Sequence, residues 1–317
     1  MTGSSIWAVT CLFNPRRAAT RLANFRTFRR RLNAPLLAVE LSFDGRFELQ
    51  PHDADILVQL DAGDVMWQKE RLLNIGIARL PDDCHYVATI DADVVFANNR
   101  WPTEAVAALQ QTPMVQLFTE AYYLAPDAEP DAAGKATVHG RQSSAARAIA
   151  RGASPEECLG VQSGTDRGRF SGGFAWAFRR DLIAAHGLYD CCIIGGGDTA
   201  VVTGATGAFA TVERRHSMSA AQCRRYRAWA VPWFKHTAGK IDALDGDLFH
   251  LWHGALENRQ ANSRHQALAA AGFDPEVDIS APPAAAWRWA SDKPGLHQLL
   301  TNYFAARRED EPACVPS

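Results

Sequence analysis

The chain's most informative stretch is Tyr86-Val-Ala-Thr-Ile-Asp-Ala-Asp-Val-Val-Phe96. Its apolar run is typical of a buried strand, and it carries two carboxylates, Asp91 and Asp93, at the carboxyl end. Asp is a poor strand residue and is costly to bury, so a pair at this place is expected to face a ligand. Open α/β sheets bind their ligands outside the carboxyl ends of the strands. Two oxygen ligands one residue apart suit a divalent cation that also holds a diphosphate, although solvated acidic turns produce the same Asp-x-Asp pair.

Strand-like and helix-like segments alternate on the N-terminal side of this stretch. Apolar runs typical of strands cover residues 6–13, 36–41 and 54–60. Apolar residues at helical spacing occur over residues 16–32 and 67–79. This βαββαβ-like order predicts an α/β fold, in which a mainly parallel nucleotide-binding sheet is flanked by helices.

Two later segments interrupt the alternation. Residues 125–169 are rich in turn-forming residues and show little periodicity. A connection of this length in a compact domain is usually a functional lid or a disordered insertion, so we predict a mobile segment that orders over a ligand. Residues 281–286, Ala-Pro-Pro-Ala-Ala-Ala, form a short linker before a C-terminal helix. We therefore predict one domain over residues 1–275, with a linker and a packed helix in 276–317.

The composition is that of an ordinary globular protein. Of 317 residues 47% are hydrophobic and 21% charged, which is enough for a sizeable core. A formal net charge of -2 gives no reason to expect nucleic acid or an anionic membrane as a partner. No apolar segment approaches the roughly 20 residues of a membrane span. Seven cysteines without CxxC spacing and an N-terminus without signal-peptide features predict a cytoplasmic protein. The sequence does not predict the oligomeric state.

Two glycine-rich segments are candidates for ligand contact. Phe170-Ser-Gly-Gly-Phe-Ala-Trp-Ala-Phe178 places Gly172 and Gly173 before an aromatic strand, where a backbone can approach a ligand closely. A simple β-bulge would explain the same pair. A second segment, Gly195-Gly-Gly-Asp198, places three glycines before a carboxylate that a small molecule could reach. Asp198 could instead cap a helix that begins at Thr199.

Three sets of polar residues complete the candidates. His250-Leu-Trp-His-Gly254 holds two imidazoles, of which one could bind a metal, although a structural histidine is the commoner case. Arg16 begins a helix just after the first strand, at a place where anions bind. The pair Lys69-Glu70 is expected on the surface.

Together, the order of these motifs resembles a known family. A strand with Asp-x-Asp, a Gly-Gly strand, a glycine-rich loop with an acid, and His-x-x-His-Gly are similar to the metal-dependent glycosyltransferases of GT-A fold. The pattern is closest to the inverting galactosyltransferase-like branch and related bacterial proteins. The segment Trp67-Gln-Lys-Glu-Arg-Leu-Leu-Asn-Ile-Gly76 resembles the one before their metal strand. The resemblance covers residues 6 to about 275, with gaps over 125–169, and it implies a GT-A-like fold with a C-terminal part on the acceptor side.

The resemblance implies a cofactor set and a role for particular residues. A divalent metal, Mn²⁺ or Mg²⁺, would be held by Asp91, Asp93 and His253, with His250 as a possible substitute. Asp198 would be the general base that takes the proton of a carbohydrate or other hydroxyl acceptor.

The same resemblance implies a nucleotide-sugar donor, UDP-linked. The donor-binding residues that it implies are Arg16, Asp91, Asp93, Gly172 and Gly173. The chain departs from the family pattern at two positions. Gly197 stands where many relatives carry an acid, and Ala261 stands where related bacterial sequences often carry an aromatic residue. Both departures affect acceptor recognition more than metal binding.

Two other classes of function remain open. A nucleotidyltransferase acting on sugar phosphates would use the same sheet and acidic metal site, but it usually has a glycine-rich basic loop after its first strand. Here that position is Phe13-Asn-Pro-Arg-Arg-Ala, without glycine. A non-catalytic nucleotide-sugar-binding relic is the second alternative, and the intact acids and His253 disfavour it. If Asp198 is not the base, Asp190 is the next candidate.

Overall fold

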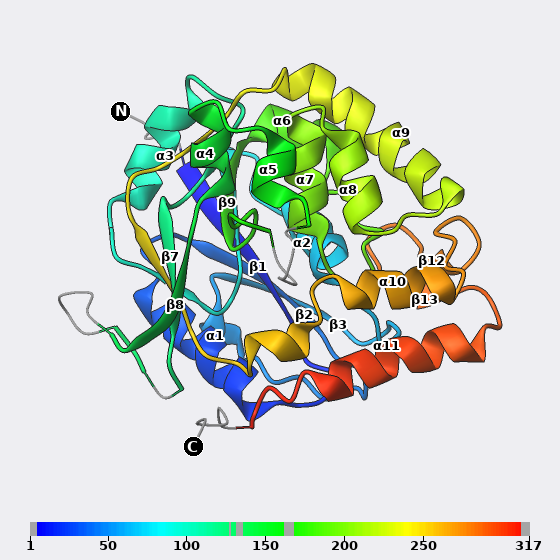
Figure 1. Cartoon of the computed structure of the whole chain (residues 1–317). Coiled ribbons are helices and arrows are strands. Elements are labelled where there is room, and N and C mark those ends of the chain that lie inside the picture. Colours follow the sequence, from blue (N-terminus) through cyan, green and yellow to red (C-terminus); the bar gives the residue numbers. More distant parts are fainter. Residues whose placement is uncertain (1–4, 127, 131–135, 162–167, 312–317) are drawn as a thin grey trace.

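A seven-stranded sheet forms the centre of the computed structural model, which describes residues 5–126, 128–130, 136–161 and 168–311. Its strands are β1 (Ser5–Phe13), β2 (Leu36–Leu41), β3 (Ile56–Leu60), β4 (Cys84–Ile90), β6 (Met114–Gln116), β9 (Ala175–Arg179) and β10 (Ile241–Ala243). Their spatial order is β10-β6-β9-β4-β1-β2-β3, and β1, β2, β3 and β9 are labelled in Figure 1. Neighbouring strands are parallel except for β9, which is antiparallel to both β4 and β6. The prediction of an α/β fold with a mainly parallel sheet flanked by helices is confirmed.

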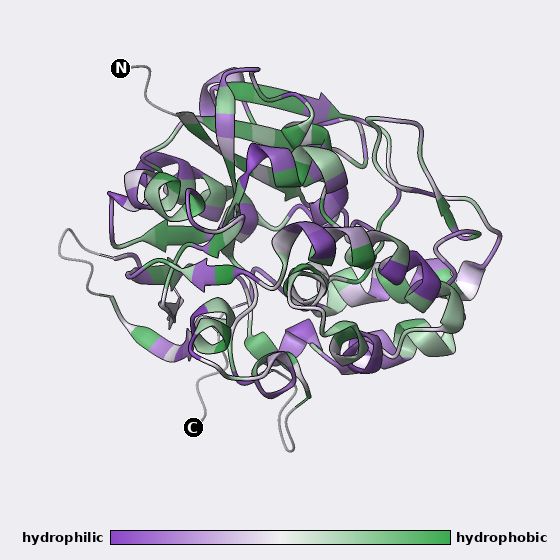
Figure 2. Ribbon diagram, turned by 90° about the horizontal axis from the view of Figure 1, so that it is seen from above, coloured by the Kyte–Doolittle hydropathy of each residue, from purple (hydrophilic) through white to green (hydrophobic). Residues whose placement is uncertain are grey.

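Helices cover both faces of this sheet. Successive residues of a strand point to opposite faces, so Ala8 and Val9 of β1 belong to two separate apolar clusters. The Ala8 cluster includes residues of α1 (Ala19–Arg31) and α3 (Trp101–Leu109). The Val9 cluster includes residues of α2 (Lys69–Ile77), α6 (Arg180–His186), α7 (Gly197–Ala205), α8 (Phe209–Arg215) and α9 (Ala220–Thr237). The strands are therefore largely apolar along their whole length, as the colours of Figure 2 show.

The stretch that carries the acid pair divides into two strands of different sheets. β4 ends at Ile90, a turn holds Asp91 and Asp93, and β5 (Val94–Phe96) begins a second sheet. This sheet has the order β5-β11-β7-β8, with β7 (Glu120–Leu124), β8 (Val138–Ser143) and β11 (Asp247–His250). β5 and β11 are antiparallel, and Val94 is opposite His250. This register brings the acid pair next to the histidine segment.

Part of the segment predicted to be irregular has regular structure. Besides β8, it contains α4 (Ala145–Ala150) and α5 (Pro155–Leu159). Ser144 and Ser154 cap these helices by accepting hydrogen bonds from backbone amides. The expectation of an irregular segment is wrong for residues 138–159, because helices this short leave no periodic signal. Residues 127, 131–135 and 162–167 of the predicted segment lie outside the described residues, and its ordering over a ligand stays a prediction.

The C-terminal part packs along the domain and returns to its beginning. Its elements are α10 (Ser263–Ala270), β12 (Ile279–Ser280), β13 (Arg288–Trp289) and α11 (Pro294–Ala306), and two short 3-10 helices elsewhere are η1 (Pro51–Asp53) and η2 (Leu256–Arg259). The predicted linker 281–286 connects β12 to β13, and α11 packs against α10 (Figure 1). Beyond α11, Asp310 accepts hydrogen bonds from the amides of Ala19 and Thr20 at 3.0 and 2.9 Å. None of the described helices is long and apolar enough to cross a membrane.

Candidate active site

A cavity of about 260 Å³ opens at the carboxyl ends of β1 and β4. Phe13, the last residue of β1, and the turn after β4 both line it because the two strands are parallel neighbours. The predicted site residues that line this cavity are Asp91, Asp93, Gly172, Gly173, Asp198, His250 and His253. The tertiary structure therefore brings together residues from four distant parts of the chain, at the edge where α/β sheets bind ligands.

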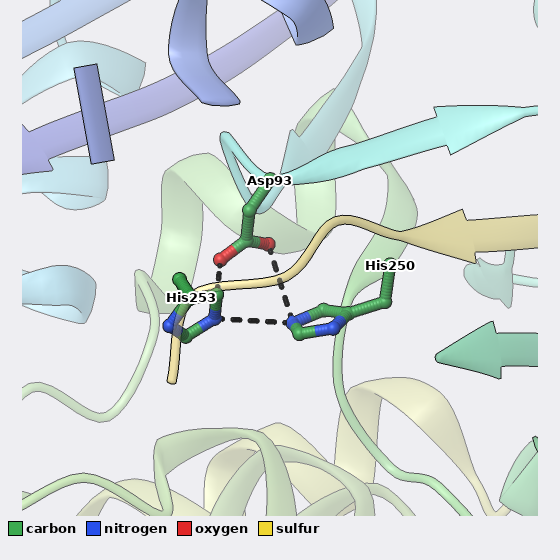
Figure 3. A group of neighbouring side chains, drawn as sticks. All are labelled: Asp93, His250 and His253. Atoms are coloured by element: carbon green, nitrogen blue, oxygen red, sulfur yellow. Dashed lines mark hydrogen bonds and ion pairs between the residues drawn. The ribbon is translucent and has the colours of Figure 1, made fainter. Parts of the chain in front are cut away.

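Asp93, His250 and His253 form a group that could hold a metal ion (Figure 3). One ligand atom from each side chain lies within 4.8 Å of the others. Nε2 of His253 lies 3.0 Å from Oδ2 of Asp93 and 3.2 Å from Nε2 of His250, whose Nε2 lies 3.8 Å from Oδ1 of Asp93. The backbone holds this geometry, since the amide of Leu251 donates to the carbonyl of Asp93 at 2.8 Å.

The electrostatic state of the group suits a divalent cation. Burial lowers the pKa of His250 well below its usual value, so the imidazole is neutral and its nitrogen can bind a metal. Burial alone would raise the pKa of Asp93, but its polar neighbours, among them His253 and Arg259, hold that pKa below its usual range. Oδ1 of Asp93 is buried and has no hydrogen-bond partner among the described residues. A buried carboxylate oxygen without a partner is costly, and a metal ion would satisfy it.

Glu309, from the segment after α11, contacts the far side of His253. Its Oε1 lies 3.4 Å from Nδ1 of His253, and the same carboxylate pairs with Arg21 and Arg307 at 2.7 and 2.8 Å. Burial would raise the pKa of Glu309, but the two guanidinium groups hold it well below its usual range. Nδ1 of His253 has no hydrogen-bond partner among the described residues, so Glu309 faces the ring as a nearby negative charge, on the side away from Asp93. Sequence reasoning missed Glu309, because no local pattern connects this tail to the histidines.

Asp91 lies outside the metal group and faces Lys69 instead. Oδ1 of Asp91 lies 2.6 Å from Nζ of Lys69. Burial raises the pKa of Asp91 to about 7, and Lys69 opposes this shift. The implied pairing of Asp91 with Asp93 as joint metal ligands thus differs from the arrangement in the structure. The cause is the turn between β4 and β5, which points the two carboxylates at different partners.

Lys69 links the two halves of the cavity. Its ammonium group lies between Asp91 and Asp198, 3.0 and 3.1 Å from the two carboxylate oxygens of Asp198. Burial would lower the pKa of Lys69, but Asp198 and Asp91 raise it well above its usual value. The expectation of a surface pair is wrong, because the Lys69 side chain is only 12% exposed and Glu70 is 4% exposed. Both residues belong to the first turn of α2, which is buried beside the sheet. The helical pattern of the sequence does not show that this turn is buried.

Asp198 faces the cavity from the first turn of α7. This helix begins at Gly197, Gly196 is its N-cap with a left-handed φ of 92°, and no side chain caps it. The alternative that Asp198 merely caps a helix starting at Thr199 is therefore wrong. A Cβ atom on Gly173 would stand 3.1 Å from Oδ2 of Asp198, so the glycine leaves room for this carboxylate.

The carboxyl group of Glu70 leaves no room for a side chain at position 197. A Cβ atom built on Gly197 would lie 2.1 Å from Oε1 of Glu70, closer than real atoms approach. The carboxyl group of Glu70 thus fills the space beside Asp198 where an acid at position 197 would stand. Burial raises the pKa of Glu70 to about 8, with Lys69 opposing the shift.

Arg16 and Asp190 do not line the cavity. Arg16 is exposed in a turn, because α1 begins at Ala19 and not at residue 16. The first amides of α1 bond to Asp310, so the chain's own carboxylate occupies the helix N-terminus where an anion was expected. Arg16 is therefore not placed to contact a ligand in this cavity. Asp190 instead pairs with Arg71 at 3.4 Å.

The lining of the cavity is strongly basic. Three of its side chains are carboxylates, those of Asp91, Asp93 and Asp198. Six are cationic, namely Arg21, Lys69, Arg215, Arg259, Arg264 and Arg307. An excess of cations in a partly closed cavity attracts an anionic ligand such as a phosphate ester. The five arginines come from five separate helices or loops, which only the tertiary structure brings together.

No family model and no curated protein matches the chain. Chains of known structure that it resembles include glycosyltransferases. Staphylococcus aureus TarS in complex with UDP matches 94% of this chain and 70% of its own, at 9% identity and a TM-score of 0.41. A variant of Drosophila beta1,4-galactosyltransferase 7 in complex with manganese, UDP-Gal and xylobiose matches 75% of this chain and 64% of its own, at 10% identity and a TM-score of 0.33.

A third similar structure is that of a nucleotide-transferring enzyme. The 4-diphosphocytidyl-2C-methyl-D-erythritol synthase of Anaerococcus prevotii matches 77% of this chain and 88% of its own, at 10% identity and a TM-score of 0.31. All three TM-scores lie below 0.5. These likenesses therefore carry no weight for the function, which rests on the chain's own residues.

Proposed function

We propose that this chain is a metal-dependent glycosyltransferase, which moves a sugar from a UDP-linked donor to a hydroxyl acceptor with inversion. One observation carries the proposal: the metal group Asp93–His250–His253 and the carboxylate of Asp198 line the same basic cavity. A reaction that releases a nucleoside diphosphate needs positive charge on the leaving group and a base on the attacking hydroxyl. A metal ion in the group would supply the first, and Asp198, which pairs with Lys69 opposite Asp91, would supply the second.

The leaving diphosphate is assigned to the metal side of the cavity. A divalent ion bound by Asp93, His250 and His253 would act there as a Lewis acid. Arg259 lines the same side, within hydrogen-bond distance of both histidines, and supplies a guanidinium group to phosphate oxygens. Asp91 is proposed to hold the donor ribose, as the family resemblance implies. The backbone of Gly172 and Gly173 lets the donor approach the sheet edge closely.

Asp198 is proposed as the general base. It is the one carboxylate on the α7 side of the cavity among the described lining residues. Lys69 holds both of its oxygens through one ammonium group, which fixes the direction in which the remaining lone pairs point. A hydroxyl acceptor that donates to such a lone pair loses its proton as it attacks the anomeric carbon. Attack from the side opposite the diphosphate would invert the configuration.

Nucleotide release from a panel of nucleotide sugars tests the proposal. The full chain is incubated with each donor and Mn²⁺ or Mg²⁺, and the products are identified by mass spectrometry. We expect a nucleoside diphosphate from UDP-sugars, with no release by Asp93→Asn. Formation of pyrophosphate from a nucleoside triphosphate and a sugar phosphate would instead identify a nucleotidyltransferase. Donor binding without turnover across a broad acceptor panel would identify a non-catalytic relic.

A further inference from the structure

Arg259 occupies the atoms that would bind the metal ion. Its Nη2 donates hydrogen bonds to Nε2 of His253 at 2.9 Å and to Nε2 of His250 at 3.3 Å. These are the same nitrogens that face Asp93 in the metal group. One guanidinium nitrogen thus contacts two of the three atoms that could bind the metal, the Nε2 atoms of His250 and His253.

Metal binding and this arginine contact exclude one another. The Nε2 lone pair of a neutral imidazole either accepts a hydrogen bond or coordinates a metal, and it cannot do both. A metal ion held by both nitrogens would need the space that the guanidinium group now fills. Arg259 must therefore move away before His250 and His253 can act together as ligands.

Arg259 has little else to hold it in place. No carboxylate lies within ion-pair distance of Arg259 among the described residues, and its buried Nε has no hydrogen-bond partner there. It ends the 3-10 helix η2, which contains no buried residue, and Gln260 follows in a left-handed conformation with φ 47°. A short segment whose residues are at most half-buried is displaced at lower cost than the core. The cation can thus leave the histidines without disturbing the core.

We propose that Arg259 stands in for the metal ion in the metal-free protein, and that metal binding releases it to bind the donor diphosphate. The inference rests on the proposed function, because the diphosphate is the ligand that receives the freed guanidinium group. In the metal-free protein, Arg259 partners the imidazole nitrogens beside Asp93. After the exchange, the metal satisfies Asp93 and the histidines, while Arg259 binds phosphate oxygens. Metal and nucleotide therefore bind cooperatively, each favouring the state in which Arg259 has moved.

Titration calorimetry of Mn²⁺ with and without UDP tests this exchange on the full chain. Arg259→Met removes the competing donor but keeps an unbranched side chain of similar length. Losing a hydrogen bond from a charged group corresponds to roughly a 10- to 100-fold change in affinity, so this variant should bind Mn²⁺ tighter by about that factor without UDP. UDP should then raise the Mn²⁺ affinity of the variant less than that of the wild type.

Arg264→Met is the matched control. Arg264 lines the same cavity and its loss removes the same charge, but it bonds Tyr303 and the carbonyl of Arg259 instead of the histidines. Its Mn²⁺ affinity without UDP should stay close to that of the wild type. Arg259→Lys retains the positive charge but lacks the planar guanidinium group, so this variant should bind Mn²⁺ with intermediate affinity. It provides the test if Arg259→Met does not fold.

Three results would overturn the inference. Unchanged Mn²⁺ affinity in Arg259→Met and Arg259→Lys, in a protein that still releases nucleotide with metal, would leave the proposed function standing and exclude the exchange. An equal gain in Arg264→Met would show a general effect of charge and also exclude it. If neither the wild type nor the Arg259 variants bind Mn²⁺, the metal centre is absent, and the proposed function fails together with the exchange.

Discussion

Asp198→Asn removes a single charge from the cavity and leaves its shape nearly unchanged. The Asn side chain has the size of Asp, and its oxygen can still accept a hydrogen bond from Nζ of Lys69, now 3.0 Å from Asp198. Lys69 keeps its ion pair with Asp91 at 2.6 Å, so no cation is left without a partner. The start of α7 is also unaffected, because no side chain caps this helix.

Two magnitudes separate a structural role from a catalytic one. The loss of one charge-assisted hydrogen bond costs at most about 1.5–3 kcal/mol of folding free energy, which a domain of this size tolerates. The loss of a general base lowers the rate by about 10² to 10⁴. That factor corresponds to about 2.7–5.5 kcal/mol in the activation free energy. The variant should therefore fold and bind UDP with Mn²⁺ like the wild type, yet release nucleotide very slowly.

The assay is the rate of nucleotide release from the best donor of the panel, measured with saturating Mn²⁺. It requires no known acceptor, because water that replaces the acceptor also needs a base. Asp190→Asn is the matched control, since Asp190 pairs with Arg71 and does not line the cavity. We expect its rate to stay near that of the wild type.

The reasoning is refuted if Asp198→Asn is folded, binds UDP and releases nucleotide at nearly the wild-type rate. The carboxylate of Asp198 would then only anchor Lys69, and the base would lie elsewhere. A large loss of rate in Asp190→Asn alone would move the assignment to that residue.

Three further predictions concern metal binding and stability. Asp93→Asn should abolish Mn²⁺ binding in titration calorimetry, and His253→Ala should weaken it less, because Asp93 then still offers its negative charge to the cation. A wild-type dissociation constant in Asp93→Asn would exclude the metal centre. Glu309→Gln should weaken Mn²⁺ binding about 10- to 100-fold, since His253 loses the negative charge beside its Nδ1. An unchanged dissociation constant would reduce Glu309 to a structural role. Burial raises the pKa of Glu70 from 4.5 to about 8, so the folded protein retains a proton there that the unfolded chain has lost. The contribution of Glu70 to the free energy of unfolding is thus present below pH 4.5 and declines as the pH rises to about 8. Glu70→Gln, which stays neutral, should show a shallower decline in urea unfolding between these pH values, and parallel curves for the two proteins would contradict the shift.

The sequence by itself determined the sheet and the edge at which the site lies. The apolar run before Asp91 is long enough for a strand that is buried on both faces, and two ionisable side chains at its end cannot continue into the core. The glycine pair that includes Gly173 and the three glycines before Asp198 also marked parts of the site. Only a residue without a side chain allows the close approach that the carboxylate of Asp198 requires. These are local properties of the chain, and they do not depend on how distant segments pack.

Only the tertiary structure decided which residues surround those acids. The pairing of β5 with β11 places His250 opposite Val94, and through it joins both histidines to Asp93 rather than to Asp91. Packing of α2 against the sheet buries Lys69 between two carboxylates, although the helical pattern of that segment is compatible with a surface position. Glu309 reaches His253 because α11 runs back along the domain. Such contacts depend on the register and direction of elements far apart in the chain, and residue periodicity contains no information about either.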